Sequence, residues 1–96
     1  MNPRLTIAIP TWNNFRVLEH CLRTLTAYTE YPYRIVIVNN GPDADLDGLP
    51  FERTLRERVP FGGLKVIQAD HNLGWQGGIN RAFLEECDTP YFCMAN

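Results

Sequence analysis

The chain has 96 residues, of which 45% are hydrophobic and 21% are charged, and its formal net charge is -2 at pH 7. This length and composition fit one small globular domain with a modest core. The scattered, slightly acidic charge argues against nucleic acid or an anionic membrane surface as the primary partner. No apolar run approaches the roughly 20 residues that cross a bilayer, so we expect no membrane span.

The cysteines indicate a reducing environment. Cys21, Cys87 and Cys93 leave an odd count for disulfides and match no familiar zinc-binding spacing. The first residues also lack the pattern of a signal peptide. We therefore expect reduced thiols packed in the core and a cytoplasmic location.

Short β-prone runs alternate with helical patterns along the first half of the chain. Residues 5–9 form the first such run, a polar turn follows it, and apolar residues then recur at helical spacing over 17–25. Residues 33–38 predict a second, buried strand. Asn39 to Asp43 then has the composition of a sharp turn.

The second half continues the alternation. Apolar residues four apart at 51–59 predict a short helix that Pro60 ends. Residues 64–69 predict a third strand, 81–86 lie in a further helix, and 91–95 predict a fourth strand. The same order runs without a linker over residues 1–96, which we therefore interpret as a single domain.

Apolar strands separated by helices predict the α/β class. We expect three layers, α/β/α, around a mostly parallel sheet of about four strands with a Rossmann-like arrangement. In such sheets the loops beyond the carboxyl ends of the strands meet near the point where the strand order reverses. The polar loops of this chain should therefore gather at one edge and form a binding site there.

The run from His71 to Asn80 is the most informative stretch, because it places three glycines between an expected strand and a helix. Gly74, Gly77 and Gly78 let the backbone come close to a bulky group. The free N–H groups of the helix start would face the same space, so an anion such as phosphate is one natural occupant. Tight packing of the helix on the sheet is the alternative for Trp75 and the last two glycines.

Three motifs, taken together, resemble the start of the family 2 glycosyltransferases of the GT-A fold. They are Ile9-Pro10-Thr11-Trp12-Asn13, Ile35-Val36-Ile37-Val38-Asn39-Asn40-Gly41 and Asn72-Leu73-Gly74-Trp75-Gln76-Gly77-Gly78-Ile79-Asn80. Each follows an expected strand, and their order and spacing agree over essentially the whole chain. The third motif also resembles the glycine-rich form of rhamnosyltransferase-like members.

The resemblance implies a site for a nucleotide-sugar donor. In the family the first motif lies against the nucleobase and ribose, and Trp12 has the flat face that this role needs. Asn39 stands where the family carries an aspartate that accepts a hydrogen bond from the base, and its amide oxygen can accept the same bond without charge. The nucleotide-sugar-binding residues that we expect are Pro10, Thr11, Trp12, Asn13, Asn39, Asn40, Gly41, Asn72, Gly74 and Trp75.

Structural roles compete with some of these assignments. Trp12 could merely cover the end of the sheet, and Asn13 could merely cap a helix. Asn39 and Asn40 could bond local backbone groups in a plain turn. Many family members also carry an arginine where this chain has Ile79, and a direct phosphate contact is therefore not expected from the third motif.

The chemistry of the family is inverting transfer of a sugar from a nucleoside diphosphate to an acceptor hydroxyl. It implies a divalent metal, Mn or Mg, and a base that takes the acceptor proton. By the resemblance, both the metal ligands and the base lie beyond Asn96. We therefore assign no catalytic residue and no metal ligand to this chain.

Two functions stay open at this point. The chain is either the donor-binding part of a truncated glycosyltransferase, inactive by itself, or a non-catalytic nucleotide-binding or assembly module with the same half-fold. A dehydrogenase fragment is disfavoured, because the turn after the first strand has no glycine. The apolar fourth strand would leave an open sheet edge, so we expect a homo-oligomer that covers it. The sequence leaves the donor base, the sugar and the acceptor open.

Overall fold

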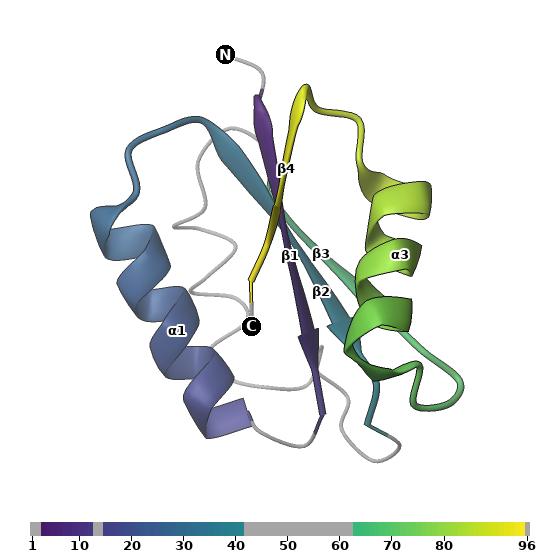
Figure 1. The fold of residues 1–96 in the computed structure, drawn as a ribbon. Coiled ribbons are helices and arrows are strands. Elements are labelled where there is room, and N and C mark those ends of the chain that lie inside the picture. Colours follow the sequence, from purple (N-terminus) through teal and green to yellow (C-terminus); the bar gives the residue numbers. More distant parts are fainter. Residues whose placement is uncertain (1–2, 13–14, 42–62, 96) are drawn as a thin grey trace.

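The computed structural model describes residues 3–12, 15–41 and 63–95 (Figure 1). The alternation of strands and helices predicted from the sequence is confirmed for these residues. The elements, in chain order, are β1 (Leu5–Thr11), α1 (Phe15–Tyr28), β2 (Tyr33–Asn39), β3 (Leu64–Gln68), α3 (Gly74–Glu86) and β4 (Tyr91–Met94). The short helix expected at 51–59 lies outside the described residues.

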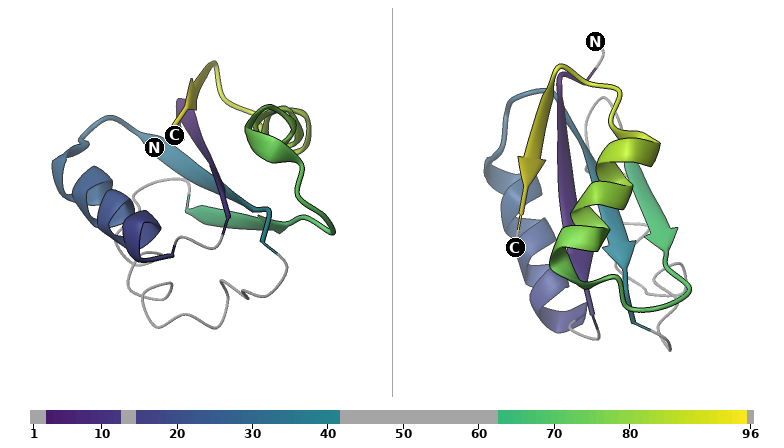
Figure 2. Two further views of the ribbon diagram at one scale, coloured as in Figure 1. Left: turned by 60° about the horizontal axis from the view of Figure 1, so that its bottom comes forward. Right: turned by 45° about the vertical axis from the view of Figure 1, so that its right-hand side comes forward.

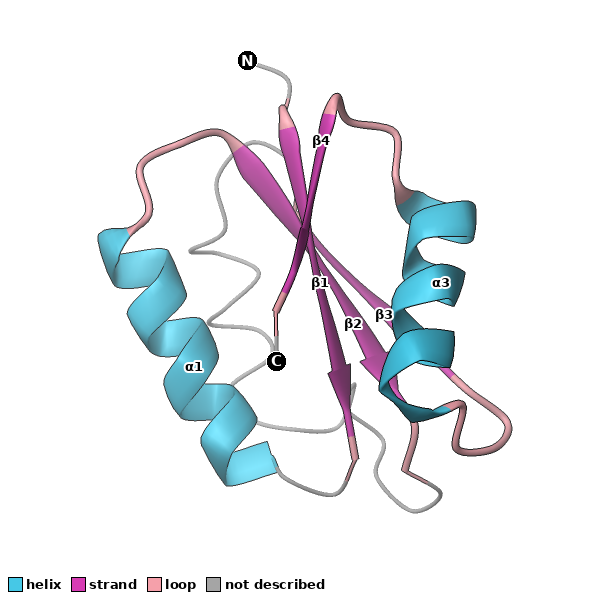
Figure 3. Cartoon of the chain, in the orientation of Figure 1, coloured by secondary structure: helices cyan, strands magenta, loops and turns pink. Residues whose placement is uncertain are grey.

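The strands form one parallel, four-stranded sheet in the order β3-β2-β1-β4. Helix α1 covers one face and α3 covers the other (Figures 1 and 2). From β1 the chain first adds β2 and β3 on one side, and then returns to add β4 on the other. Right-handed crossovers that run in opposite directions place their helices on opposite faces of the sheet. This is the three-layer, Rossmann-like α/β arrangement that the sequence predicts (Figure 3).

The core consists of two layers, one on each face of the sheet. The layer beneath α1 contains Ile7, Ile9, Leu18, Leu22, Tyr33, Ile35, Ile37 and Leu64. The layer beneath α3 contains Ala8, Val36, Val38, Ile67, Ile79 and Ala82. Because both faces are covered, the inner strands β1 and β2 are apolar at consecutive positions, and each large aliphatic side chain contributes about 1.5–3 kcal/mol on burial.

Strand β1 is longer than the sequence predicts, since it continues through Pro10 to Thr11. Proline has no N–H to donate, which normally argues against a strand interior. Here the backbone of Ala8 bonds on the side of β4, where Ala95, the residue after β4, donates its N–H to the Ala8 carbonyl at 2.9 Å. The backbone nitrogen of Pro10 faces the same side of β1 as that of Ala8. The pairing of β1 with β4 ends at Ala8 and Met94, so the missing N–H of Pro10 removes no hydrogen bond from the ladder. The extension carries the first motif to the carboxyl edge of the sheet.

Helix α3 begins earlier than the sequence predicts. It starts at Gly74, so Gly77 and Gly78 lie inside the helix and not in the preceding turn. Glycine in a helix interior costs about 1 kcal/mol relative to alanine, which is why the pattern favours a turn. Tertiary packing reverses that preference, because a Cβ on Gly78 would lie 3.0 Å from the Cβ of Pro10. The expected alternative of tight helix-to-sheet packing is thus confirmed for Gly78.

Strand β4 forms one edge of the sheet and is only partly covered. Tyr91 and Met94 are 56% and 58% exposed, and Phe92 packs edge-on against Phe83 of α3 at 5.1 Å between ring centroids. The prediction that the cysteines are buried in the core is wrong, because Cys93 is exposed on β4, and Cys21 and Cys87 are only partly buried and belong to neither core layer. A strand at the edge of the sheet lies partly beyond the helices that cover its two faces, so several side chains of β4 stay exposed.

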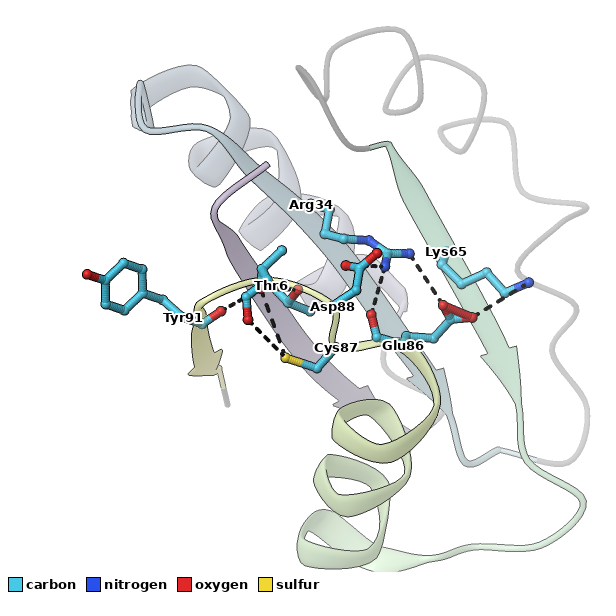
Figure 4. Close-up of polar contacts among 8 residues, drawn as sticks. Thr6, Arg34, Lys65, Glu86, Cys87, Asp88 and Tyr91 are labelled. Carbon is cyan, nitrogen blue, oxygen red and sulfur yellow. Dashed lines mark hydrogen bonds and ion pairs between the residues drawn. The ribbon is translucent and has the colours of Figure 1, made fainter. Parts of the chain in front are cut away.

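The amino end of the sheet is closed by a polar cluster (Figure 4). Arg34 of β2 donates to the Glu86 carbonyl at 2.7 Å and also pairs with the carboxylates of Glu86 and Asp88. On β1, the hydroxyl of Thr6 bonds that of Thr89 at 2.7 Å. These contacts hold the end of α3 and the turn before β4 against the sheet.

Over the described residues, neither helix has the length and apolarity that a membrane span needs.

Candidate functional site

A pocket of about 290 Å³ lies at the carboxyl end of β1. The order of the strands reverses at β1, because β2 and β3 are added on one side of it and β4 on the other. It is lined by Pro10, Thr11, Trp12, Asn40, Asn72, Gly74 and Trp75. All of these residues belong to the set predicted from the sequence, and they come from all three motifs. The structure therefore brings together at one pocket segments that are far apart in the chain.

Two tryptophans provide the aromatic surface of this pocket. Trp12 follows the end of β1 and is 54% exposed, whereas Trp75 lies in the first turn of α3 and is 44% exposed. Exposed aromatic rings of this size offer flat apolar faces to a ligand. Trp12 lies in the pocket wall at the end of the sheet, and both roles given to it from the sequence, ligand contact and cover for the sheet end, stay predictions.

Asn40 joins the end of β2 to the start of α3. Its side chain is buried, its Oδ1 accepts a bond from the Leu73 N–H at 3.3 Å, and its Nδ2 donates to the Gly74 carbonyl at 3.2 Å. Its backbone N–H donates to the Thr11 carbonyl at 2.8 Å, which also ties it to β1. The alternative role of bonding local backbone groups is therefore wrong for the Asn40 side chain, whose backbone partners lie 33 and 34 residues further along the chain. Asn40 also contributes to the pocket wall.

Asn72 and Gly74 shape the turn that enters α3. The Gly74 N–H donates to the Asn72 Oδ1 at 2.9 Å, and Gly74 has a φ of 74°. That left-handed conformation strains any residue with a Cβ, so the position requires glycine even though a side chain would meet open space. The predicted free N–H groups at the helix start are only partly free, because Leu73 and Gly74 donate to asparagine side chains.

Asn39 and Gly41 lie behind the pocket and not in its wall. Asn39 is fully buried, and its Oδ1 accepts from the Gly41 N–H at 3.1 Å. Its Nδ2 donates to the Gln68 Oε1 at 2.8 Å. The amide oxygen expected to meet a base is thus engaged within the turn, and donor contact by Asn39 or Gly41 stays a prediction. Asn13 lies outside the described residues.

Gln68 lies next to the site and was not predicted from the sequence. Its Nε2 lies 3.2 Å from the Gly41 carbonyl, 3.3 Å from that of Asn39 and 3.1 Å from that of Ala69, so it ties the end of β3 to the turn after β2. The alignment of β2 with β3 could have indicated Gln68, because Asn39 and Gln68 are partners in the β2–β3 ladder. Register is not evident from a single strand.

The described residues of the site bring no cation into the pocket. Ile79, which stands where many family members carry arginine, packs in the core beneath α3. Arg81 pairs with Glu85 along the helix. In the loop before Asn72, the exposed His71 Nδ1 lies 2.7 Å from the Asp70 Oδ1, and this hydrogen bond holds the pKa of Asp70 below its usual value. None of these side chains lines the described pocket wall.

A second pocket, of about 200 Å³, lies on the α1 side of the same Pro10–Trp12 segment. Its wall contains Ile9, Val17, Leu18 and Cys21 and is mainly apolar. It offers none of the asparagine side chains of the first pocket. The first pocket is therefore the better candidate for a polar ligand.

The residues present do not fit a divalent metal. Mn and Mg prefer carboxylate oxygens, whereas the described pocket wall offers only amide and hydroxyl groups. Among the residues that the structure describes, no three His, Cys, Asp or Glu side chains are grouped so that they could hold a metal ion.

A parallel sheet with helices on both faces, and a pocket at the carboxyl end of its central strand, define a Rossmann-like α/β domain of the kind that begins the GT-A fold. The chain matches the model of glycosyl transferase family 2 over residues 6–96. It therefore belongs to that family, as the three motifs predict. Comparison with curated proteins and with solved structures gives no match.

Proposed function

We propose that this chain is the donor-binding part of an inverting glycosyltransferase and that its pocket holds the nucleoside part of a nucleotide-sugar. The observation that carries this proposal is the convergence of all three motifs on one pocket, at the sheet edge where ligands of open α/β sheets bind. Membership of the family supplies the substrate class, a nucleotide-sugar donor and an acceptor.

Thermal unfolding in the presence of a panel of sugar nucleotides tests the proposal. A donor present at about 100 times its Kd stabilises the folded chain by about 2.7 kcal/mol, which is readily seen as a rise in Tm. Each donor is tested with and without manganese. We expect one donor to raise the Tm and Trp75→Ala to abolish the rise, while Tyr28→Ala, an exposed change on α1, keeps it. If no donor raises the Tm, the donor-site proposal fails and the module alternative gains support.

We further propose that the 96-residue chain does not transfer sugar by itself. The described pocket wall contains no carboxylate or imidazole that could take a proton from an acceptor hydroxyl. Incubation of the purified chain with a sugar nucleotide, manganese and a panel of alcohol acceptors should release no nucleoside diphosphate above the buffer control. Turnover that depends on protein concentration would contradict this proposal.

An assembly role is supported by the edge strand β4. Its outer side has no neighbouring strand among the described residues, and Tyr91 and Met94 are exposed there. We propose a homo-oligomer in which a second copy covers this edge. Sedimentation at micromolar concentration should show a species larger than the monomer, and Met94→Lys should dissociate it. A monomer at all concentrations would refute it.

We propose a cytoplasmic location for the chain. All three cysteines are free thiols, which suits a reducing compartment. Fractionation of cells that produce the protein should recover it in the cytosolic fraction. Recovery from an oxidising compartment would contradict the assignment.

A further inference from the structure

Asn39 and Gln68 are partners across the β2–β3 ladder, and their side-chain amides are hydrogen-bonded to each other at 2.8 Å. We infer that these two amides form a matched pair that positions the pocket wall through Asn40, and that Asn39 serves this pair instead of contacting the ligand. Gln68 is thereby a positioning residue of the site. The inference rests on the proposed function for the class of ligand, and it adds the residues that hold the wall in place.

Backbone groups fix which way each amide points. The Asn39 Oδ1 accepts from the Gly41 N–H at 3.1 Å, so its Nδ2 is directed at Gln68. The Gln68 Nε2 lies within 3.3 Å of three backbone carbonyl oxygens, those of Asn39, Gly41 and Ala69, so its Oε1 is directed at Asn39. Turning either amide over would place a donor against a donor or an acceptor against acceptors. The contact between the two side chains is therefore a donor that meets an acceptor.

This arrangement requires an amide, and not a carboxylate, at position 39. An aspartate could still accept from the Gly41 N–H, but its second oxygen would face the Gln68 Oε1. Two acceptors would then meet at a position where the Asn39 side chain is fully buried, away from water that could separate them. Gln68 could avoid the conflict only by giving up its contacts with the three carbonyls. The residue at 68 therefore decides which residue position 39 can hold.

The pair acts on the pocket through Asn40, which lies between two residues that the pair holds. Gln68 donates to the carbonyls of Asn39 and Gly41, and Asn39 accepts from the Gly41 N–H. The backbone on both sides of Asn40 is thus fixed to the end of β3. The Asn40 side chain lines the pocket and bonds two backbone groups at the start of α3. Loss of the pair should therefore displace the wall, although neither amide of the pair lines the described pocket.

Urea denaturation tests the pair without any ligand. Asn39→Asp should lower the unfolding midpoint by about 1–2 M, and Gln68→Lys by about 0.5–1 M. The double variant Asn39→Asp/Gln68→Lys should lie within about 0.5 M of the parent chain, because a lysine ammonium donates both to the carbonyls and to the carboxylate. Asn72→Asp is the matched control. The Asn72 Oδ1 accepts from the Gly74 N–H, a bond that a carboxylate accepts equally well, so its midpoint should not fall.

Nucleotide binding tests the positioning role. Quenching of tryptophan fluorescence reports binding, because the only two tryptophans of the chain, Trp12 and Trp75, line the pocket. The chains are titrated with the diphosphates of uridine, thymidine and guanosine. Asn39→Asp should weaken the nucleotide that the parent chain binds by about tenfold, and the double variant should restore its Kd to within about threefold. Direct contact predicts the opposite, because a carboxylate is the stronger acceptor for a base N–H, and Asn39→Asp alone would then bind at least as tightly as the parent.

The opposite results have separate meanings. A midpoint loss in the double variant that equals the sum of the two single losses overturns the pair. If Asn39→Asp alone does not fold, a folded double variant supports the pair and an unfolded one overturns it. Undiminished nucleotide binding by Asn39→Asp overturns the positioning role. If the parent chain binds no nucleotide, the donor-site proposal fails and the positioning role with it, while the urea midpoints still decide whether the two amides are paired.

Discussion

Replacement of Asn40 by alanine should destabilise the whole domain, although Asn40 is only one of the residues that line the pocket. The change removes the acceptor of the Leu73 N–H and the donor to the Gly74 carbonyl. A buried polar group that loses its partner costs about 1–3 kcal/mol. Because both lost bonds are only part-buried, each falls in the lower part of that range, and the two together cost about 2–4 kcal/mol. Small domains have a total stability of roughly 5–15 kcal/mol, so the variant should still fold.

Urea denaturation followed by circular dichroism measures this loss. With a slope of about 1–1.5 kcal/mol per molar urea, the unfolding midpoint of Asn40→Ala should fall by about 2 M. Asn72→Ala is the matched control, since it makes the same chemical change in the same pocket wall. It removes one bond, to the Gly74 N–H, from an exposed side chain, and should cost about 0.5–1 kcal/mol. Equal shifts for the two variants, or a shift of less than about 0.5 M for Asn40→Ala, would refute the role of Asn40 in holding α3.

Three further predictions concern packing, protonation and the polar cluster. In Gly78→Ala the new Cβ would lie 3.0 Å from the Cβ of Pro10. Overpacking should cost about 1–3 kcal/mol of stability and so exceed the gain of about 1 kcal/mol from the higher helix propensity of alanine. A raised urea midpoint would contradict this prediction. Burial raises the pKa of Tyr33, whose hydroxyl has no hydrogen-bond partner in the described structure. Because the native state keeps this proton after the unfolded chain loses it, the stability of the domain falls above pH 10. Tyr33→Phe should be no less stable than the parent chain at pH 7, and it should lose less stability when the urea midpoint is remeasured at about pH 10.5. Arg34→Ala should cost about 1–3 kcal/mol, whereas Asp88→Ala, on a side chain that is 76% exposed, should cost under about 1 kcal/mol. Equal urea midpoints for the two variants would contradict the role of Arg34 in holding the polar cluster together.

The sequence anticipated the pocket wall better than it anticipated the turn behind it. Pro10, Thr11 and Trp12 could be predicted because a motif that follows a strand must lie at the carboxyl edge of a parallel sheet. Asn39 is one residue from Asn40 in the chain, but it is turned inward, where it bonds Gln68 and Gly41. Successive residues at the end of a strand face opposite sides, and which side is the pocket depends on the neighbouring strand.

The sequence by itself determined the α/β class, the alternation of elements and the family, because burial of a sheet on both faces requires apolar runs and because the three motifs are local patterns. Only the tertiary structure decided where α3 begins, how far β1 extends and which side chains are free for a ligand. Position 78 of α3 favours glycine because Pro10 lies against it, and Asn40 is buried because α3 starts beside it. These outcomes arise from contacts between residues more than 30 positions apart, and local propensity contains no information about such contacts.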